Sequence, residues 1–258
     1  MKAVAAIVLV LCYLAPSQAW NCTEGPRLYH ALQIDAGHGQ VVGINRYSYV
    51  YFLLGTHWYR LSSLRVKHCS VGPAGLWAVS TTNNVFKWSA GRFHQHGGMG
   101  IQQVDAGGNG QVVGTGSNQT YCLTRTNASA YREVADMSWQ SLSWTMQYYS
   151  CGPFGCWGVD SSHKVYFTQG INASTCATGG WIHLPGQSMN MIEVGTDGSV
   201  FGVGTDGRIY QRIGINSSWA LGTEWSIIAG CMTIRHVSYD LGYLWAVTES
   251  GLVLLCTE

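Results

Sequence analysis

Residues 194–214, VGTDGSVFGVGTDGRIYQRIG, show one pattern twice: a short apolar run followed by Thr-Asp-Gly or its equivalent. Within this stretch Gly202, Gly204 and Gly207 match the G-x-G-x-x-G spacing of a dinucleotide-binding loop. Such a loop opens a helix, whereas Gly207 is followed at 208–212 by Arg-Ile-Tyr-Gln-Arg, a run typical of a β-strand. The glycines therefore indicate tight turns between strands and not a phosphate site.

The same pattern recurs along the chain. Asp206-Gly207 and Asp197-Gly198 supply the positive φ angles of two hairpin turns. A small residue inside an apolar run marks each unit, and successive marks are 35, 36, 44, 44 and 44 residues apart. These anchor residues are Gly43, Ala78, Gly114, Gly158, Gly202 and Ala246.

Each unit is predicted to contain four short strands. A repeat of about 40 residues with four strands is the signature of a propeller blade, whose faces are buried only against neighbouring blades. No helical periodicity follows residue 19. We therefore predict an all-β, six-bladed β-propeller of four-stranded antiparallel blades.

The two ends of the chain are predicted to meet. The last unit lacks its tryptophan-bearing strand, and an orphan Trp-Asn-Cys segment stands at 20–22. If this N-terminal strand closes the last blade, Cys22 and Cys256 lie side by side and form a disulfide.

The first residues have the features of a secretory signal peptide. Lys2 is followed by an apolar stretch at 3–14 and by Ser-Gln-Ala at 17–19, a small-x-small cleavage pattern. We expect residues 1–19 to be removed and 20–258 to form one secreted, extracellular domain. The apolar stretch is shorter than the ~20 residues that a membrane span needs.

Secretion favours disulfides between the eight cysteines that remain. Besides Cys22–Cys256 we expect Cys151–Cys156, which would pin a hairpin loop. Three pairings of the other four cysteines are open, and proximity of units favours Cys69–Cys122 and Cys176–Cys231. Candidate N-glycosylation sites are Asn21, Asn118, Asn127, Asn172 and Asn216.

The low charge excludes two classes of partner. Charged residues make up 10% of the chain and the formal net charge is +1. This composition lacks the basic footprint that a nucleic-acid backbone or an anionic bilayer attracts. The chain instead has 11 tryptophans and 14 tyrosines, which provide abundant aromatic contact surface.

The fifth unit carries a family resemblance. Its Trp-x-x-Leu-Pro-Gly at 181–186, Ile-Glu-Val-Gly at 192–195, Val-Phe-Gly-Val at 200–203 and the run at 207–212 resemble the tectonin repeat. With its leader and eight cysteines, the chain is similar to the secreted fish-egg lectins of that family. The resemblance implies binding of N-acetylglucosamine, galactose or bacterial lipopolysaccharide, in egg or innate immune defence.

A sugar site needs an aromatic platform beside fixed hydrogen-bonding groups. Polar turns after the anchor strands are expected to project on one rim with the loops that leave the tryptophan strands. At any one position the same residues are also ordinary turn formers, and the tryptophans also pack between strands. The candidate carbohydrate-binding residues are Asn83, Asn84, Asp160, Ser161, Trp181, Asn190, Asp206 and Trp219.

Other functions are less favoured by the sequence. No cofactor is required; Asp105, Asp197 and Asp240 are candidate calcium ligands, although no dedicated calcium loop is present. Catalysis is not expected, because a glycosidase needs paired carboxylates across a cleft and most carboxylates here fall in turns. A non-catalytic scaffold for protein–protein interaction is the alternative function, and a homodimer is a candidate assembly.

Overall fold

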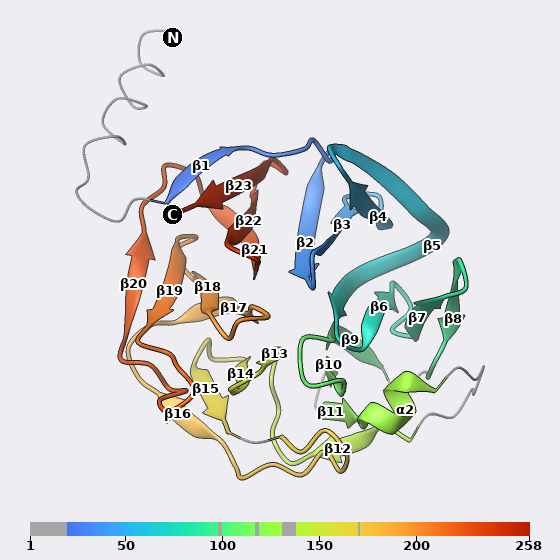
Figure 1. Ribbon diagram of the computed structural model, residues 1–258, viewed down its shortest axis with the longest axis vertical. Helices are drawn as coiled ribbons and strands as arrows, with labels where there is room; N and C mark the ends of the chain where they lie inside the picture. The colour runs from blue at the N-terminus through green and yellow to red at the C-terminus, as the bar shows by residue number, and fades with distance from the viewer. Residues whose placement is uncertain (1–19, 98–99, 117–118, 131–137, 170) are drawn as a thin grey trace, which may run out of the picture.

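The computed structural model describes residues 20–97, 100–116, 119–130, 138–169 and 171–258. The expected signal peptide and the candidate glycosylation site Asn118 lie outside these residues. Antiparallel sheets stand side by side around a common centre, and the chain travels once around the ring (Figure 1). Within the described part, no helix is long and apolar enough to cross a membrane.

Four of the sheets have four strands each. The first, in order, contains β12 (Gln140–Leu142), β11 (Thr120–Leu123), β10 (Val112–Gly116) and β9 (Ile101–Asp105). The second contains β13 (Tyr148–Gly152), β14 (Gly155–Val159), β15 (Val165–Thr168) and β16 (Ile182–Leu184). The third contains β17 (Met189–Val194), β18 (Val200–Gly204), β19 (Ile209–Ile213) and β20 (Glu224–Ile228). The fourth contains β1 (Asn21–Glu24), β23 (Val253–Thr257), β22 (Tyr243–Thr248) and β21 (Ile234–Asp240).

A seven-stranded sheet completes the described ring. Its order is β2 (Ala31–Gly37), β3 (Gln40–Asn45), β4 (Tyr49–Leu54), β5 (His57–Gly72), β6 (Gly75–Ser80), β7 (Val85–Ser89) and β8 (Arg92–Gln95). The long strand β5 pairs with β4 through residues 57–65 and with β6 through residues 66–72. Two groups of strands therefore share β5.

The structure also contains a short helix that the sequence does not predict. Helix α2 (Arg125–Ser129) has five residues, too few to show a helical period, and Thr124 caps its N-terminus by accepting a hydrogen bond from Asn127 N at 3.4 Å. It lies beside β11 at the edge of the ring (Figure 1).

The anchor residues occupy one register position throughout. Each lies on the second strand of its unit, opposite a core residue of the innermost strand, as Gly158 lies opposite Tyr149 and Gly202 opposite Ile192. A Cβ atom on Gly158 would lie 2.9 Å from Met146 Sδ, so the position has no room for a larger side chain. The repeat seen in the sequence is therefore a repeat in packing.

Large aromatic side chains next to the anchors fill the spaces between sheets. Trp77, Trp157 and Phe201 are fully buried, and Trp245 is nearly so. Phe201 contacts Trp20 edge-to-face, with ring centroids 5.6 Å apart. These contacts bury the blade faces against one another, and Trp20 adds the N-terminal segment to the packing.

The disulfides confirm two of the four predicted pairs. Strand β1 pairs antiparallel with β23, and Cys22 is bonded to Cys256, which lies directly opposite it. Figure 1 shows β1 beside β23, close to the C-terminus. Cys151 and Cys156 face each other across the β13–β14 hairpin and are also bonded.

The other two predicted pairs are wrong. Cys122 is bonded to Cys176, so neither Cys69–Cys122 nor Cys176–Cys231 forms. Cys69 is a buried free thiol at an inner-strand core position, whereas Cys122 lies on the third strand of its unit, where Cys69 cannot reach it. The segment after β15 runs back beside Cys122, since Arg125 N donates to Ala173 O at 2.7 Å. Cys231 is itself disulfide-bonded.

Hydroxyl and carboxyl groups alternate around the centre of the ring. On each inner strand, one core residue lies opposite the anchor, and the next residue along the chain carries one of these polar groups. The six residues are Asp35, Ser70, Asp105, Ser150, Glu193 and Ser238. All six side chains are buried. The name "central polar ring" is used below for this set.

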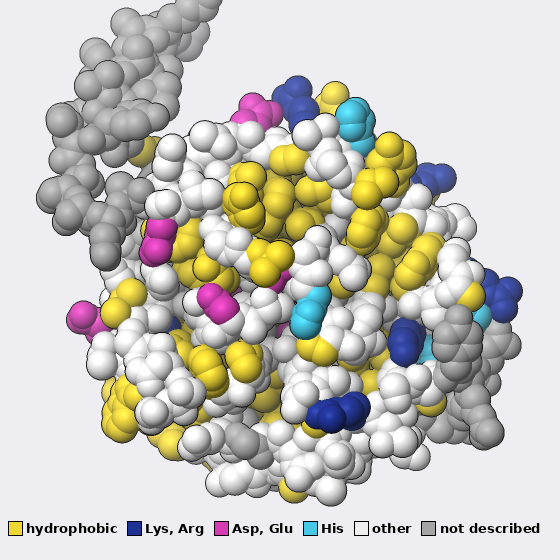
Figure 2. Space-filling view, viewed as in Figure 1, with side chains coloured by type: hydrophobic (Ala, Val, Ile, Leu, Met, Phe, Trp, Pro, Cys, Tyr) yellow, Lys and Arg dark blue, Asp and Glu magenta, His cyan; other side chains and the backbone are white. Residues whose placement is uncertain are grey.

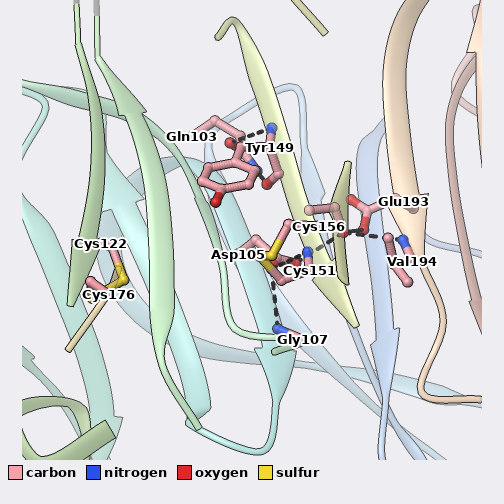
Figure 3. The surroundings of a disulfide bond; sticks show 11 residues. Gln103, Asp105, Gly107, Cys122, Tyr149, Cys151, Cys156, Cys176, Glu193 and Val194 are labelled. Atoms are coloured by element: carbon pink, nitrogen blue, oxygen red, sulfur yellow. Dashed lines mark hydrogen bonds between the residues drawn. A yellow bond between two sulfur atoms is a disulfide. The ribbon is translucent and has the colours of Figure 1, made fainter. Parts of the chain in front are cut away.

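Hydrogen bonds from the central polar ring join neighbouring inner strands. Asp35 Oδ1 accepts from Val71 N at 2.7 Å, and Ser70 Oγ accepts from Ala106 N at 3.0 Å. Ser238 Oγ accepts from Ala36 N at 2.8 Å, which connects β21 to β2 of the seven-stranded sheet. In Figure 3, dashed lines join Asp105 to the backbone nitrogens of Cys151 and Gly107.

The three carboxyl groups of this ring have perturbed acidities. Burial raises the pKa of Asp105 to about 7. Burial, together with the negative charges of the other carboxylates, raises the pKa of Asp35 and of Glu193 well above the ordinary range. Tyr148 donates to Glu193 Oε1 at 2.6 Å. Burial therefore disfavours the charged form of all three groups.

We expect the Ser238→Ala substitution to lower the free energy of unfolding by about 1–3 kcal/mol, because it leaves the buried Ala36 N–H without an acceptor. Urea denaturation measures the change. Ser217→Ala, at an exposed position and without loss of the Asn216 sequon, is the control and should change stability by less than about 0.5 kcal/mol. Equal stability of the two variants would show that the bond from Ala36 to Ser238 contributes nothing.

Candidate functional site

The turns that follow the anchor strands lie at one end of their strands, next to the segment that enters the following inner strand. Met189 N donates to His163 O at 3.0 Å, and Ile234 N donates to Gly207 O at 2.8 Å. At the boundary between the β21–β23 sheet and the seven-stranded sheet, Ala31 N donates to Gly251 O at 3.1 Å. Polar turns and entry segments therefore form one continuous rim, as the sequence analysis expects.

The turn between β14 and β15 holds Asp160 in a fixed position. Its Oδ1 accepts from Ser162 N at 2.8 Å and from Lys164 N at 2.9 Å, and its Oδ2 accepts from Tyr166 Oη at 3.1 Å. Burial, together with the hydrogen bond to Asp160, raises the pKa of Tyr166. Ser161, the other candidate in this turn, is exposed.

Aromatic side chains surround Tyr166. The indole of Trp144 is 42% exposed, and its ring centroid lies 6.0 Å from that of Tyr166. The imidazole centroid of His183 lies 5.2 Å from the same Tyr166 ring. An exposed indole, a phenol hydroxyl and a carboxylate thus occur together. The set of Trp144, Asp160, Tyr166 and His183 is called the Trp144 cluster below.

No sequence pattern predicts Trp144, Tyr166 or His183 as site residues. Trp144 precedes Tyr148 by four residues, in an irregular segment between β12 and β13 that has no repeat signature. In two other sheets, the residue at the same sequence distance before the equivalent inner-strand position is also exposed. These residues are Tyr29 and Met232. Counting back the same number of residues from that position in each inner strand would have identified Trp144, Tyr29 and Met232 from the sequence.

Asp206 repeats this arrangement in the next sheet. Its Oδ2 accepts from Tyr210 Oη at 2.8 Å, and Tyr210 has the same register as Tyr166. Burial alone would raise the pKa of Asp206, but the hydrogen bonds from Arg208 N and Tyr210, with the Arg208 charge, hold it below its usual value. Asn190 Nδ2 donates to Gly204 O at 3.4 Å, so the two predicted residues Asn190 and Asp206 lie on neighbouring segments.

Asn83 and Asn84 lie in the turn between β6 and β7. Asn83 has a positive φ of 67°, and its Oδ1 accepts a hydrogen bond from Lys67 Nζ. Asn84 Nδ2 donates to Thr82 Oγ1 at 3.2 Å. Both amides are partly exposed and take part in turn contacts.

The predicted tryptophan platforms do not lie beside the predicted polar turns. Trp181 precedes Ile182, which pairs with Phe167 at the end of β15 remote from Asp160, and its ring packs on Tyr149 at 5.1 Å. Trp219 and the Asp206 turn lie at opposite ends of strand β19, which is roughly 13 Å long. Its indole is 55% exposed.

The three candidate calcium ligands do not converge. Asp105 is buried in the central polar ring, and Asp240 accepts from Gly39 N at 2.6 Å. Asp197 is exposed and accepts from Ser199 N at 2.8 Å. Within the described ranges, no group of three or more His, Cys, Asp or Glu side chains has an arrangement that could hold a metal ion.

The candidate glycosylation sites in the described residues differ in exposure. Asn21, Asn172 and Asn216 are exposed, and Asn127 is half-buried in α2. Asn172 and Asn216 each accept hydrogen bonds from backbone N–H groups two and three residues ahead, as in an Asx turn.

A family model described as Tectonin domain matches residues 30–249. The chain belongs to the tectonin family. This tectonin is 40% identical over 227 residues to Fish-egg lectin of Cyprinus carpio, across 87% of this chain and 94% of that protein. A tectonin beta-propeller repeat-containing protein of Drosophila melanogaster is 27% identical over 100 residues, which is 36% of this chain and 7% of that protein.

Solved structures with low sequence identity share the fold. A gluconolactonase, XC5397 from Xanthomonas campestris, superposes with a TM-score of 0.66 at 9% identity, over 92% of this tectonin and 89% of that chain. The WD40 repeats of RRP9 superpose with a TM-score of 0.59 at 10% identity, over 88% and 80% of the two chains. The tectonin is therefore a β-propeller.

Proposed function

We propose that this tectonin is a secreted lectin without catalytic activity, and that the Trp144 cluster is one of its sugar-binding sites. The exposed indole beside a carboxylate held by its own turn is the observation that carries this assignment. The identity to Fish-egg lectin over nearly the whole of both chains supports it.

The cluster suits the two surfaces of a sugar ring. The apolar C–H face of a pyranose packs on an indole, and its hydroxyl groups donate to a carboxylate and exchange hydrogen bonds with a phenol. N-acetylglucosamine and galactose are the proposed ligands, alone or within bacterial lipopolysaccharide, in egg or innate immune defence. Glycans on the exposed sequons and a homodimer belong to the same proposal.

The architecture would present several such sites. We read the seven-stranded sheet as two blades that share β5, which makes six blades, with β1 closing the last one. The exposed side chains of Tyr29 and Met232 then repeat the place of Trp144 at two other blade boundaries. Weak sites repeated on one ring gain up to ~10²–10⁴ in avidity on a dense glycan surface whose spacing matches.

We expect Trp144→Ala to weaken binding of N-acetylglucosamine or galactose about tenfold, as measured by isothermal titration calorimetry. A sugar face covering roughly 60 Å² of indole contributes about 1.5 kcal/mol at ~25 cal/mol per Å². Trp219→Ala removes another exposed indole, at the opposite end of a blade, and serves as the control. Equal losses in both variants would refute the assignment of this cluster.

The alternative scaffold function makes a different prediction. If the protein is a scaffold, both variants still bind a protein partner, and calorimetry detects no sugar binding. The alternative of a glycosidase has less support, because the half-buried carboxylate of Asp160 and the exposed one of Asp206 each accept a hydrogen bond from a tyrosine of their own sheet.

A further inference from the structure

One part of the ring has an unbalanced positive charge. Residues 36–104 contain six Lys or Arg residues and no Asp or Glu, although the whole chain is close to neutral. Figure 2 agrees with this asymmetry, because the dark blue side chains lie mainly over β4–β8 and the magenta ones mainly on the side of β20 and β23. The proposed function does not use these cations.

Three of the arginines gather around two tyrosines. The guanidinium of Arg65 lies 4.0 Å from the ring centroid of Tyr49, and that of Arg60 lies 4.7 Å from the same ring. Arg46 lies 4.9 Å from the ring of Tyr47. These five residues, from β4, β5 and the turn between β3 and β4, are called the arginine–tyrosine cluster.

The contacts hold the guanidinium groups in place. Arg46 Nη2 donates to Tyr47 Oη at 2.7 Å, and Arg65 Nη1 donates to the carbonyl oxygen of Tyr47. A guanidinium that stacks through its face keeps most of its N–H donors in the plane, where they can bind an oxyanion through two parallel bonds. All three arginines are exposed, so these donors face solvent.

Within the described residues, no carboxylate neutralises the cluster. The ion pairs there join Arg27 to Glu24, Arg208 to Asp206 and Arg235 to Glu249. Two arginines against one tyrosine ring repel each other, and an oxyanion between them would relieve that repulsion.

The cluster also adjoins a predicted sugar-contacting turn. Thr81 N donates to Arg65 O at 3.0 Å, and Lys67 Nζ donates to Asn83 Oδ1. Cations, aromatic rings and the partly exposed amide of Asn83 therefore lie next to one another on the polar rim. The cations and the aromatic rings can bind an oxyanion, and the amide can form a hydrogen bond with a sugar hydroxyl.

We infer that the arginine–tyrosine cluster, with Lys67 and Asn83, is a second site that binds sugars carrying an oxyanion, such as a phosphate or sulfate ester. The inference rests on the proposed lectin function and adds a ligand class to it. Neutral sugars bind at the Trp144 cluster, whereas the anionic group of a modified sugar selects the second site.

The test uses the Trp144→Ala protein, in which the first site is disabled. Calorimetry at low salt compares N-acetylglucosamine, N-acetylglucosamine 6-phosphate and inorganic phosphate. We expect the sugar phosphate to bind at least tenfold more tightly than either of the other two, and more weakly at 0.15 M salt. Adding Arg46→Gln and Arg65→Gln should abolish this preference.

Arg27→Gln with Arg235→Gln is the matched control, since it removes the same charge from exposed sites elsewhere. Equal losses in both double variants would overturn the inference, because net charge alone would then explain binding. Inorganic phosphate binding as tightly as the sugar phosphate would overturn the assignment of a sugar ligand. Absence of neutral-sugar binding by the unmodified protein refutes the Trp144 site alone, so the two failures are distinguishable.

Discussion

Replacing Cys22 and Cys256 by serine is expected to lower the free energy of unfolding by about 5 kcal/mol. The disulfide joins residues 234 positions apart, and in the chain-entropy model closing so long a loop restricts the unfolded chain strongly. It also fixes β1 against β23 and Trp20 against Phe201, so its loss frees the N-terminal segment from the ring. Guanidinium denaturation under non-reducing conditions measures the change.

The Cys151–Cys156 disulfide provides an internal control. It closes a loop of only five residues, for which the same model gives about 2 kcal/mol. If the two double-serine variants were equally stable, the Cys22–Cys256 bond would not be restricting the whole chain, and the N-terminal strand would be an appendage.

Substituting Asp105 by asparagine is expected to change how stability depends on pH. Burial raises the pKa of Asp105 to about 7, above the value of 3.8 for an exposed aspartate. Between these values the unfolded chain releases a proton that the folded chain keeps, so this group makes the protein less stable as pH rises from about 4 to about 7. The full difference corresponds to roughly 4 kcal/mol.

Asparagine cannot ionise but keeps an oxygen that can accept from Cys151 N and Gly107 N. The variant should therefore gain up to about 4 kcal/mol over the unmodified protein between pH 4 and pH 8. The measurement is denaturation at several pH values in EDTA, which removes any bound calcium. The opposing titration of His236, whose pKa burial lowers to about 3, occurs in both proteins and cancels in the comparison.

Asp197→Asn removes an exposed carboxylate outside the central polar ring and serves as the control. A constant stability difference between the Asp105 variant and the unmodified protein would contradict a protonated Asp105 in the folded state.

The repeat in the sequence was sufficient to predict the register of the ring, because Gly or Ala is the only kind of residue that fits opposite the inner strand. The unassigned segment at 20–22 was sufficient to predict Cys22–Cys256, because the last unit lacked one strand and this segment belonged to no other unit. Cys122–Cys176 could not be predicted, because it depends on the path of the irregular segment after β15.

The site was harder to predict for a geometric reason. Asp160 and Asp206 lie in turns, which have a sequence signature, and Asn190 lies on strand β17 next to the Asp206 turn. Trp181 and Trp219 were placed beside them by proximity in sequence, whereas the adjoining strands carry them to the opposite end. Trp144 lies in a segment without a pattern and reaches Tyr166 only in the folded chain.

A glycan array probed with the unmodified protein and the Trp144→Ala protein, each with and without EDTA, tests the lectin assignment most directly. The account predicts binding of the unmodified protein to arrayed N-acetylglucosamine or galactose glycans, and a large loss of that signal in the variant. An array on which the folded, disulfide-bonded protein binds nothing, or on which the variant binds equally well, would contradict it.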